Sequence, residues 1–185
     1  MALLQRAWHI CLLREGPQDL PYSPQMTLQA LLLLGAVLWV GIALVPGQDG
    51  AAPGWAYALV GVATTAAWPW VALRLRRWGE RYAQAVFAFA LSGLLFAAVA
   101  LPLQIIAGTL LPGGGPINPD AALPVPLAFI GLVMLLLLVW KLRVDAHLWA
   151  QTLDIPRFPA LMIALALAIS EVLLINAFAP VAATP

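Results

Sequence analysis

The chain has 185 residues, of which 63% are hydrophobic and only 9% are charged. A water-soluble domain carries about 25% charged residues, so this composition excludes a surface that lies wholly in water, and the hydrophobic excess is expected to face lipid. The formal net charge of +1 gives no reason to expect a nucleic-acid partner, and the single cysteine, Cys11, excludes an internal disulfide and a multi-cysteine metal site.

The first 26 residues are expected to lie in the cytoplasm as an amphipathic helix followed by a proline-rich linker. Within residues 2–14, apolar side chains recur at helical spacing on one face, and Arg6 and His9 lie on the opposite face. The pattern ends before Pro17. We interpret this segment as a helix in the inner interface of the membrane. A short cytosolic helix packed on the bundle is the alternative.

A helix of about 20 residues crosses the hydrocarbon core of a bilayer, which is about 30 Å thick. Residues 27–180 contain five apolar stretches of this length, which predict an all-α, polytopic transmembrane helix bundle. The predicted spans are residues 27–45, 55–73, 82–111, 125–144 and 160–179. The third is too long for one straight crossing and is expected to kink near Pro102. The fourth could continue as a helix to Leu153.

The basic residues predict the orientation, because Lys and Arg are enriched in cytoplasmic loops. In a five-span arrangement, all nine lie before the first span, between the second and third, or between the fourth and fifth. A four-span arrangement would split them between the two sides. We therefore predict a cytoplasmic N-terminus and a short external tail at residues 181–185. Arginine-rich basic residues and abundant alanine and leucine favour a bacterial inner membrane as the location.

Glu171 is the only ionisable residue well inside a predicted span, and it is expected close to the midplane. A carboxyl group at that depth costs about 3 kcal/mol to insert, so it needs a polar neighbour. Ala160, Ala164 and Ala168 precede it on one narrow helix face. Small residues at this spacing let helices approach closely, so we expect Glu171 to point into the bundle.

At a similar depth lie Thr64 and Thr65 of the second span and Ser92 of the third, and their hydroxyl groups are the expected partners of Glu171. No Lys or Arg is expected at this level, so Glu171 is expected to be protonated at neutral pH. One interpretation is a proton or cation site, since intramembrane acids often mark ion pathways. The other is a protonated group that joins two helices by hydrogen bonds, and we favour it for a single acid without charged partners.

Gln104 and Asn176 fall near the outer boundary, where they could line an outer vestibule or serve as ordinary interfacial residues. We recognise no phosphate-binding loop, nucleophile elbow or zinc-protease motif. The sequence therefore predicts no catalytic residues, no cofactor and no nucleic-acid partner. Enzymatic activity stays open, with the balance against it.

Asp145, His147 and Asp154 form a polar group after the fourth span. Asp145 and His147 are two residues apart and so do not share a helix face, which argues against a metal site. Lys141 and Asp145 have instead the spacing of an ion pair on a helix surface. We therefore predict no metal ligands in this segment.

Directly before the first span stand the residues Asp-Leu-Pro-Tyr-Ser-Pro, at positions 19–24. This segment resembles the Asp-Leu-Tyr-Gly-Pro type of sequence that precedes the first span of Yip1-domain proteins, which also have five spans and a cytoplasmic N-terminus. The chain lacks the glycine of that motif and the Gly-Tyr-Gly sequence common in the family. The resemblance covers residues 17–180 by the order of spans, and it implies a small membrane protein that acts through partners without catalysis.

Two functions remain after these observations. The leading hypothesis is a non-enzymatic integral membrane protein that associates with itself or with other membrane proteins through small-residue helix faces. The alternative is a small transporter or channel subunit that uses Glu171 as a proton or cation site, which predicts a polar cavity reaching Glu171.

Overall fold

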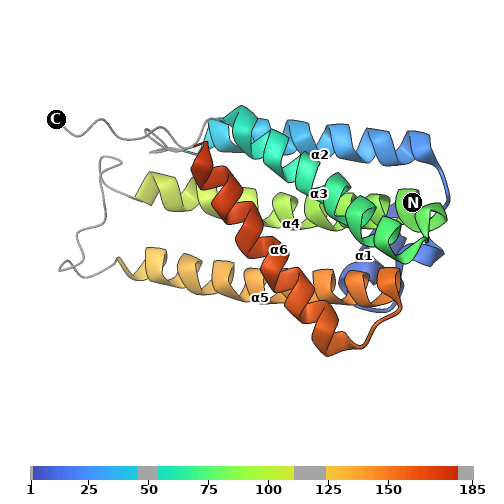
Figure 1. Cartoon of the computed structure of the whole chain (residues 1–185). Helices are drawn as coiled ribbons and strands as arrows, with labels where there is room; N and C mark the ends of the chain where they lie inside the picture. Colours follow the sequence, from blue (N-terminus) through green and yellow to red (C-terminus); the bar gives the residue numbers. More distant parts are fainter. Residues whose placement is uncertain (1, 46–53, 111–123, 179–185) are drawn as a thin grey trace.

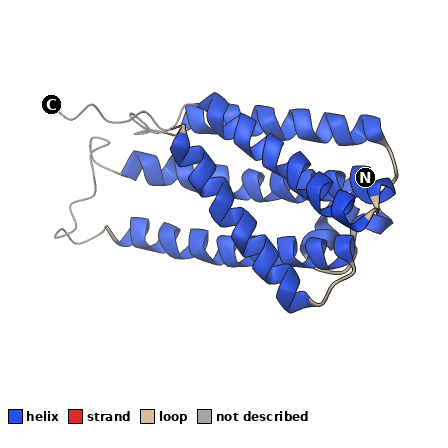
Figure 2. Cartoon of the chain, in the orientation of Figure 1, coloured by secondary structure: helices blue, strands red, loops and turns tan. Residues whose placement is uncertain are grey.

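The computed structural model describes residues 2–45, 54–110 and 124–178, and the structure is all-α within them (Figure 2). The helices are α1 (Ala2–Cys11), α2 (Pro24–Leu44), α3 (Gly54–Arg76), α4 (Tyr82–Leu110), α5 (Val125–Leu153) and α6 (Arg157–Ala177). Two short 3-10 helices, η1 (Pro17–Asp19) and η2 (Gly79–Arg81), lie before α2 and α4. Five of these segments, α2 to α6, are long and apolar enough to cross a membrane, which confirms the predicted polytopic bundle.

The helix ends differ by a few residues from the predicted spans. The first span begins at Pro24 because Ser23 caps the helix, its hydroxyl accepting a hydrogen bond from the Met26 N–H at 3.3 Å. The third span stays helical through Pro102, and the fourth continues to Leu153. The predicted tail at residues 181–185 lies outside the described residues.

The helices run in two main directions (Figure 1). α2, α4 and α5 lie side by side along the bundle, and α3 and α6 cross them obliquely. α2 packs on α3 and α4, α4 packs on α5, and α6 packs on both α5 and α3. α6 meets α5 where the two helices are joined and diverges from it along its length, so the two are widely separated at their far ends (Figure 1).

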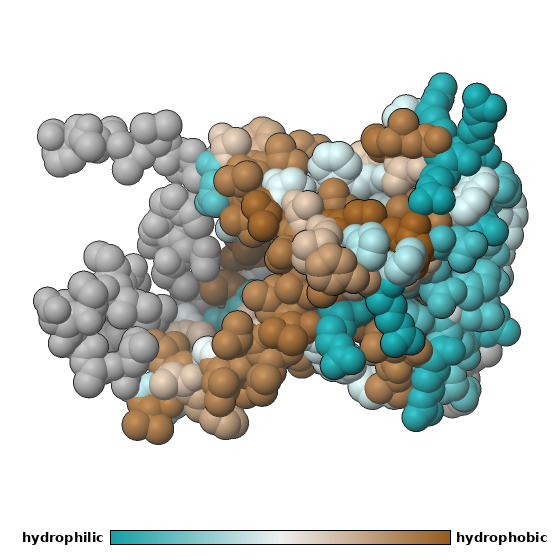
Figure 3. Space-filling view, turned by 60° about the horizontal axis from the view of Figure 1, so that its bottom comes forward, coloured by the Kyte–Doolittle hydropathy of each residue, from teal (hydrophilic) through white to brown (hydrophobic). Residues whose placement is uncertain are grey.

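The charged residues divide the bundle into two halves. Every Lys and Arg lies toward the side where α2, α4 and α6 begin, which we call the basic end, and a hydrophilic surface gathers at one end of the molecule (Figure 3). The other side is called the opposite end. The described part of the structure therefore agrees with the sequence pattern that groups all nine basic residues.

The N-terminal segment packs on the protein at the basic end. Ile10 and Cys11 of α1, together with Leu20, are buried against α4 and α5. They share one apolar cluster with Phe87, Ala88, Val144 and Leu148, among others. The apolar face of α1 is thus covered by other helices, as in the alternative of a helix packed on the bundle. Its position in the membrane interface stays a prediction.

Hydrogen bonds fasten this segment to the helices beneath it. Trp140 Nε1 donates to the Cys11 carbonyl at 3.0 Å, and His147 Nε2 donates to the Glu15 carbonyl at 3.1 Å. Gln84 donates to the Leu20 carbonyl at 2.9 Å. We call residues 5–20 with these contacts the N-terminal clasp.

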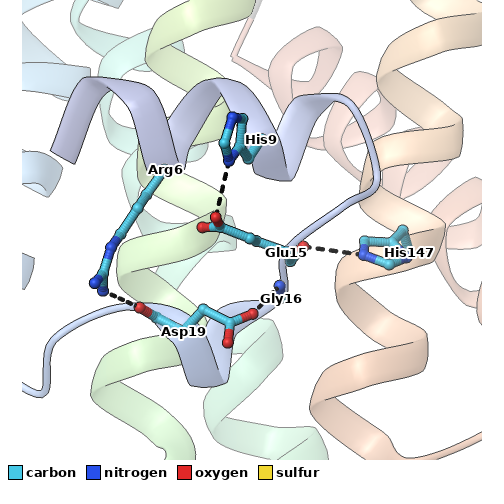
Figure 4. Close-up of polar contacts among 6 residues, drawn as sticks. All are labelled: Arg6, His9, Glu15, Gly16, Asp19 and His147. Carbon is cyan, nitrogen blue, oxygen red and sulfur yellow. Dashed lines mark hydrogen bonds and ion pairs between the residues drawn. The ribbon is translucent and has the colours of Figure 1, made fainter. Parts of the chain in front are cut away.

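The clasp is also braced internally (Figure 4). His9 Nδ1 and a Glu15 carboxylate oxygen lie 2.9 Å apart, and Asp19 accepts from the Gly16 N–H at 2.8 Å. Arg6 donates to the Asp19 carbonyl. Together with the buried apolar side chains, these contacts hold the clasp in one conformation on α4 and α5.

Candidate intramembrane site

Glu171 lies in the wall of a cavity of about 430 Å³ inside the bundle. All five long helices contribute to the wall, and α6 presents Ala164, Ala168 and Glu171 to it. The predicted small-residue face of α6 therefore points inward, with Ala160 and Ala164 buried against α3 and α5. The small side chains keep α6 close to the bundle near the basic end, and the cavity opens where the helices diverge.

The carboxyl group of Glu171 is directed at α3. Its Oε1 atom lies 3.8 Å from the position that a Cβ atom at Gly61 would occupy, which is an ordinary van der Waals distance. The Glu171 side chain is half-buried and has no hydrogen bond or ion pair with any residue that the structure describes. Its polar atoms are therefore directed to the cavity.

The hydroxyl groups that we expected to bind Glu171 have other partners. Thr64 donates to the carbonyl groups of Val60 and Gly61 on its own helix, at 2.8 Å and 3.2 Å. Ser92 is buried outside the cavity wall and donates to the Phe89 carbonyl at 2.9 Å. Thr65 does line the cavity, as does Thr64. The structure thus brings Glu171, Thr64 and Thr65 to one cavity but joins none of these side chains by a hydrogen bond.

The ion pair that the sequence predicted on a helix surface lies instead in the same cavity wall. Lys141 Nζ lies 2.6 Å and 2.5 Å from the two carboxylate oxygens of Asp145, and both residues line the cavity. The pair has the predicted spacing, but its side chains are only 30% and 19% exposed and do not lie on an open surface. Helical phase could have indicated this, because Met134 and Leu138 precede Lys141 on one face of α5 and also line the cavity.

The remaining polar residues singled out in the sequence lie in different parts of the structure. Gln104 lines the cavity, whereas Asn176 does not contribute to its wall. His147 binds the clasp, and Asp154 ends α5 in a left-handed conformation with φ 49°. No group of three His, Cys, Asp or Glu residues that could hold a metal occurs among the residues with described positions.

Five aromatic rings lie in the cavity wall among aliphatic side chains. Tyr57 and Trp68 come from α3, Phe89 and Phe96 from α4, and Trp149 from α5. The Nε1 donor of Trp68 is buried and has no partner among the described residues. A cavity with aromatic walls and a few polar groups is typical of sites that bind small molecules, which range from about 300 to 1,000 Å³.

The side of the bundle is hollowed beside these residues. A space-filling view shows hydrophobic surface around a hollow with hydrophilic surface at its floor (Figure 3). Leu138 lines the cavity and is 54% exposed, and no residue of the most apolar window of α5 is buried by the described helices. In a bilayer, lipid chains would therefore reach the α5 side of the cavity.

No protein-family model matches the chain, and no curated protein or solved structure matches it either. The resemblance to Yip1-domain proteins therefore stays a prediction. Within the part of the chain that the structure describes, Glu171 has no hydrogen-bond partner in the cavity, and Lys141 and Asp145 neutralise each other there.

Proposed function

We propose that this chain is a membrane transporter, or a subunit of one, in which Glu171 binds a proton or a cation inside the helix bundle. The observation that carries the proposal is the position of Glu171 in a cavity without a described partner. A carboxyl group that joined two helices would be expected to form hydrogen bonds with groups on the neighbouring helix. A carboxyl group directed at a cavity can exchange its proton and can attract a cation.

Association through helix faces is the second candidate. The face that suggested it is occupied within the chain, because Ala160 and Ala164 are buried against neighbouring helices. An associating partner would need another face. The exposed apolar residues of α5, such as Leu132, Leu135 and Leu136, offer one, although lipid covers such a face equally well.

The proposal includes a location and an orientation. We place the chain in a bacterial inner membrane with the N-terminus and the basic end in the cytoplasm, as the distribution of Lys and Arg favours. A reporter enzyme fused after Pro185 should be active only when the fusion site is external. A cytoplasmic reporter signal would contradict the orientation.

Proton movement tests the function. The full chain is reconstituted in vesicles that contain a pH-sensitive dye, and a potassium diffusion potential is applied. We expect proton flux above that of empty vesicles for the wild-type chain and for Glu80→Gln, whose side chain is exposed at the basic end. Glu171→Gln keeps the shape of the side chain without its titration and should abolish the flux. Equal flux in Glu171→Gln, or none in the wild type, would contradict the proposal.

A further inference from the structure

We propose that the cavity binds a hydrophobic, monovalent organic cation that enters from the lipid on the α5 side. The inference rests on the proposed function, because the positive charge of the ligand would interact with the carboxylate of Glu171. It adds the chemical class of the ligand, which follows from three properties of the cavity: its charge, its aromatic walls and its exposure to lipid.

The charge of the cavity favours a cation. Lys141 is held by Asp145, so this pair contributes no net charge. The other titratable residues that line the cavity are Tyr57 of α3 and Glu171 of α6. The wall residues from α2 and α4 are uncharged. When Glu171 loses its proton, the described wall carries one unbalanced negative charge, so a cation can take the place of the proton and an anionic ligand would be repelled.

The aromatic walls favour an organic cation over a metal ion. Five rings from α3, α4 and α5 line the cavity, and the faces of such rings attract cations. Lys141 already demonstrates this contact, because its Nζ atom lies 5.8 Å from the centre of the Phe96 ring. A small metal ion would have to exchange its water for oxygen ligands, and the described wall offers few of them. A cation that carries aromatic or alkyl groups keeps its charge while the groups pack on the rings.

The exposure of the cavity favours entry from lipid. Leu138 belongs to the cavity wall and is half-exposed on the side of α5, and the hollow in Figure 3 has hydrophobic surface around it. A hydrophobic cation partitions into the bilayer before it reaches this side. The cavity volume of about 430 Å³ accommodates a molecule with several rings.

The probe is tetraphenylphosphonium, and the matched control is tetraphenylborate, which has similar size and shape but the opposite charge. Binding to the purified full chain in lipid nanodiscs is measured by equilibrium dialysis, against empty nanodiscs. We expect saturable binding of the phosphonium by the wild type and by Glu80→Gln, and at least tenfold weaker binding by Glu171→Gln. Tetraphenylborate should show no saturable binding.

The pH dependence separates a charge effect from a loss of folding. Protonation of Glu171 removes the negative charge, so phosphonium binding to the wild type should weaken as the pH falls. The weak binding of Glu171→Gln should stay level across the same range. Glu171→Asp retains the charge and should recover most of the affinity, whereas a variant that merely packs poorly would not recover it.

Three results would overturn the inference. They are equal phosphonium binding by Glu171→Gln and wild type, equal binding of tetraphenylborate, which would indicate a neutral apolar site, and no saturable phosphonium binding. If phosphonium fails to bind but Glu171-dependent proton flux persists, the ligand class is wrong and the proposed function stands. If phosphonium binds through Glu171 but no proton moves, the site stands and the proposed proton movement is wrong.

Discussion

The basic half of the bundle and the opposite half are built differently. In the basic half, two apolar clusters enclose side chains from the clasp and from α2 to α6, and hydrogen bonds hold the clasp to α4 and α5. In the opposite half, α5 and α6 diverge, and the cavity that Glu171 faces lies between the helices, with a wall that reaches back to Lys141, Asp145 and Trp149 toward the basic end. The same helices pass through both halves, so the difference lies in side-chain size and in the crossing angle of α6.

This difference shows how one small bundle can hold a fixed framework and a partly open site. The packed half sets where each helix starts, and small residues such as Ala160 and Ala164 let α6 cross closely there. Beyond this crossing, separation of the helices leaves the Glu171 carboxyl group facing the cavity without a hydrogen-bond partner among the described residues. Experiments that perturb one half at a time can therefore test whether the two halves differ in stability.

The largest effect is expected from a cavity made in the packed half. Leu148 is fully buried in the apolar cluster under the clasp, so Leu148→Ala should lower the free energy of unfolding by about 2–5 kcal/mol. Leu135→Ala, on the same helix but 56% exposed, is the matched control and should change it by less than about 0.5 kcal/mol. Thermal unfolding in detergent measures both, and equal effects would refute the contrast between the halves.

The next effect concerns the thiol of Cys11 in the clasp. Burial raises its pKa from 9.0 to about 11, with smaller opposing contributions from Lys141 and Asp145. The reactive thiolate is therefore lost below about pH 11 in the folded chain, and at pH 8 it is about 100-fold scarcer than at a thiol with the ordinary pKa. Maleimide labelling should be slower by about this factor, or more, before denaturation than after it. Fast labelling of the folded chain would show that the clasp opens freely.

A smaller effect is expected from the hydrogen bond between α5 and the clasp. Trp140→Phe keeps an aromatic ring but removes the Nε1 donor of the Cys11 carbonyl. The free energy of unfolding should fall by about 1 kcal/mol, and labelling of Cys11 should become faster. Trp39→Phe, at an exposed position on α2, serves as the control. No change in either measurement would mean that apolar packing alone holds the clasp.

The smallest effect is expected in the opposite half, at Thr64. Its hydroxyl group is satisfied by carbonyl groups of its own helix, a bond that adds little to packing between helices. Thr64→Val should therefore change phosphonium affinity and proton flux by less than about twofold. A loss comparable to that of Glu171→Gln would show that Thr64 contacts the ligand directly.

The apolar stretches and the helix-breaking residues between them predicted most of the fold. The number and order of spans followed from the length of the apolar stretches. The start of α2 did not, because residues 23–26 were assigned to the linker although Pro24 after Ser23 is a recognisable helix start. The clasp was foreseen only as an amphipathic helix, with two places where it could lie. The choice between them depended on Ile10 and Cys11 finding a complementary surface on α4 and α5, and periodicity does not encode that surface.

The site was less predictable than the spans. The inward direction of Glu171 followed from the alanines before it, but its partners were assigned by depth along straight helices. Depth does not fix helix rotation, so Ser92 at the expected level lies outside the cavity wall. Thr64 does line the cavity, but its hydroxyl group donates to its own backbone. Lys141 and Asp145 were placed at a helix surface on their spacing alone, which does not show which side of α5 the pair occupies, and the pair lies in the cavity wall.

The clasp also imposes an order on the assembly of the chain during synthesis. Its anchors on α5 come late: Trp140 follows Cys11 by 129 residues, and His147 follows Glu15 by 132. The clasp leaves the ribosome before α5, so its contacts with α5 can form only after that helix has been made. The clasp therefore packs on helices that are already present. A nascent chain that stops before α5 would leave Ile10 and Cys11 without their apolar partners on that helix.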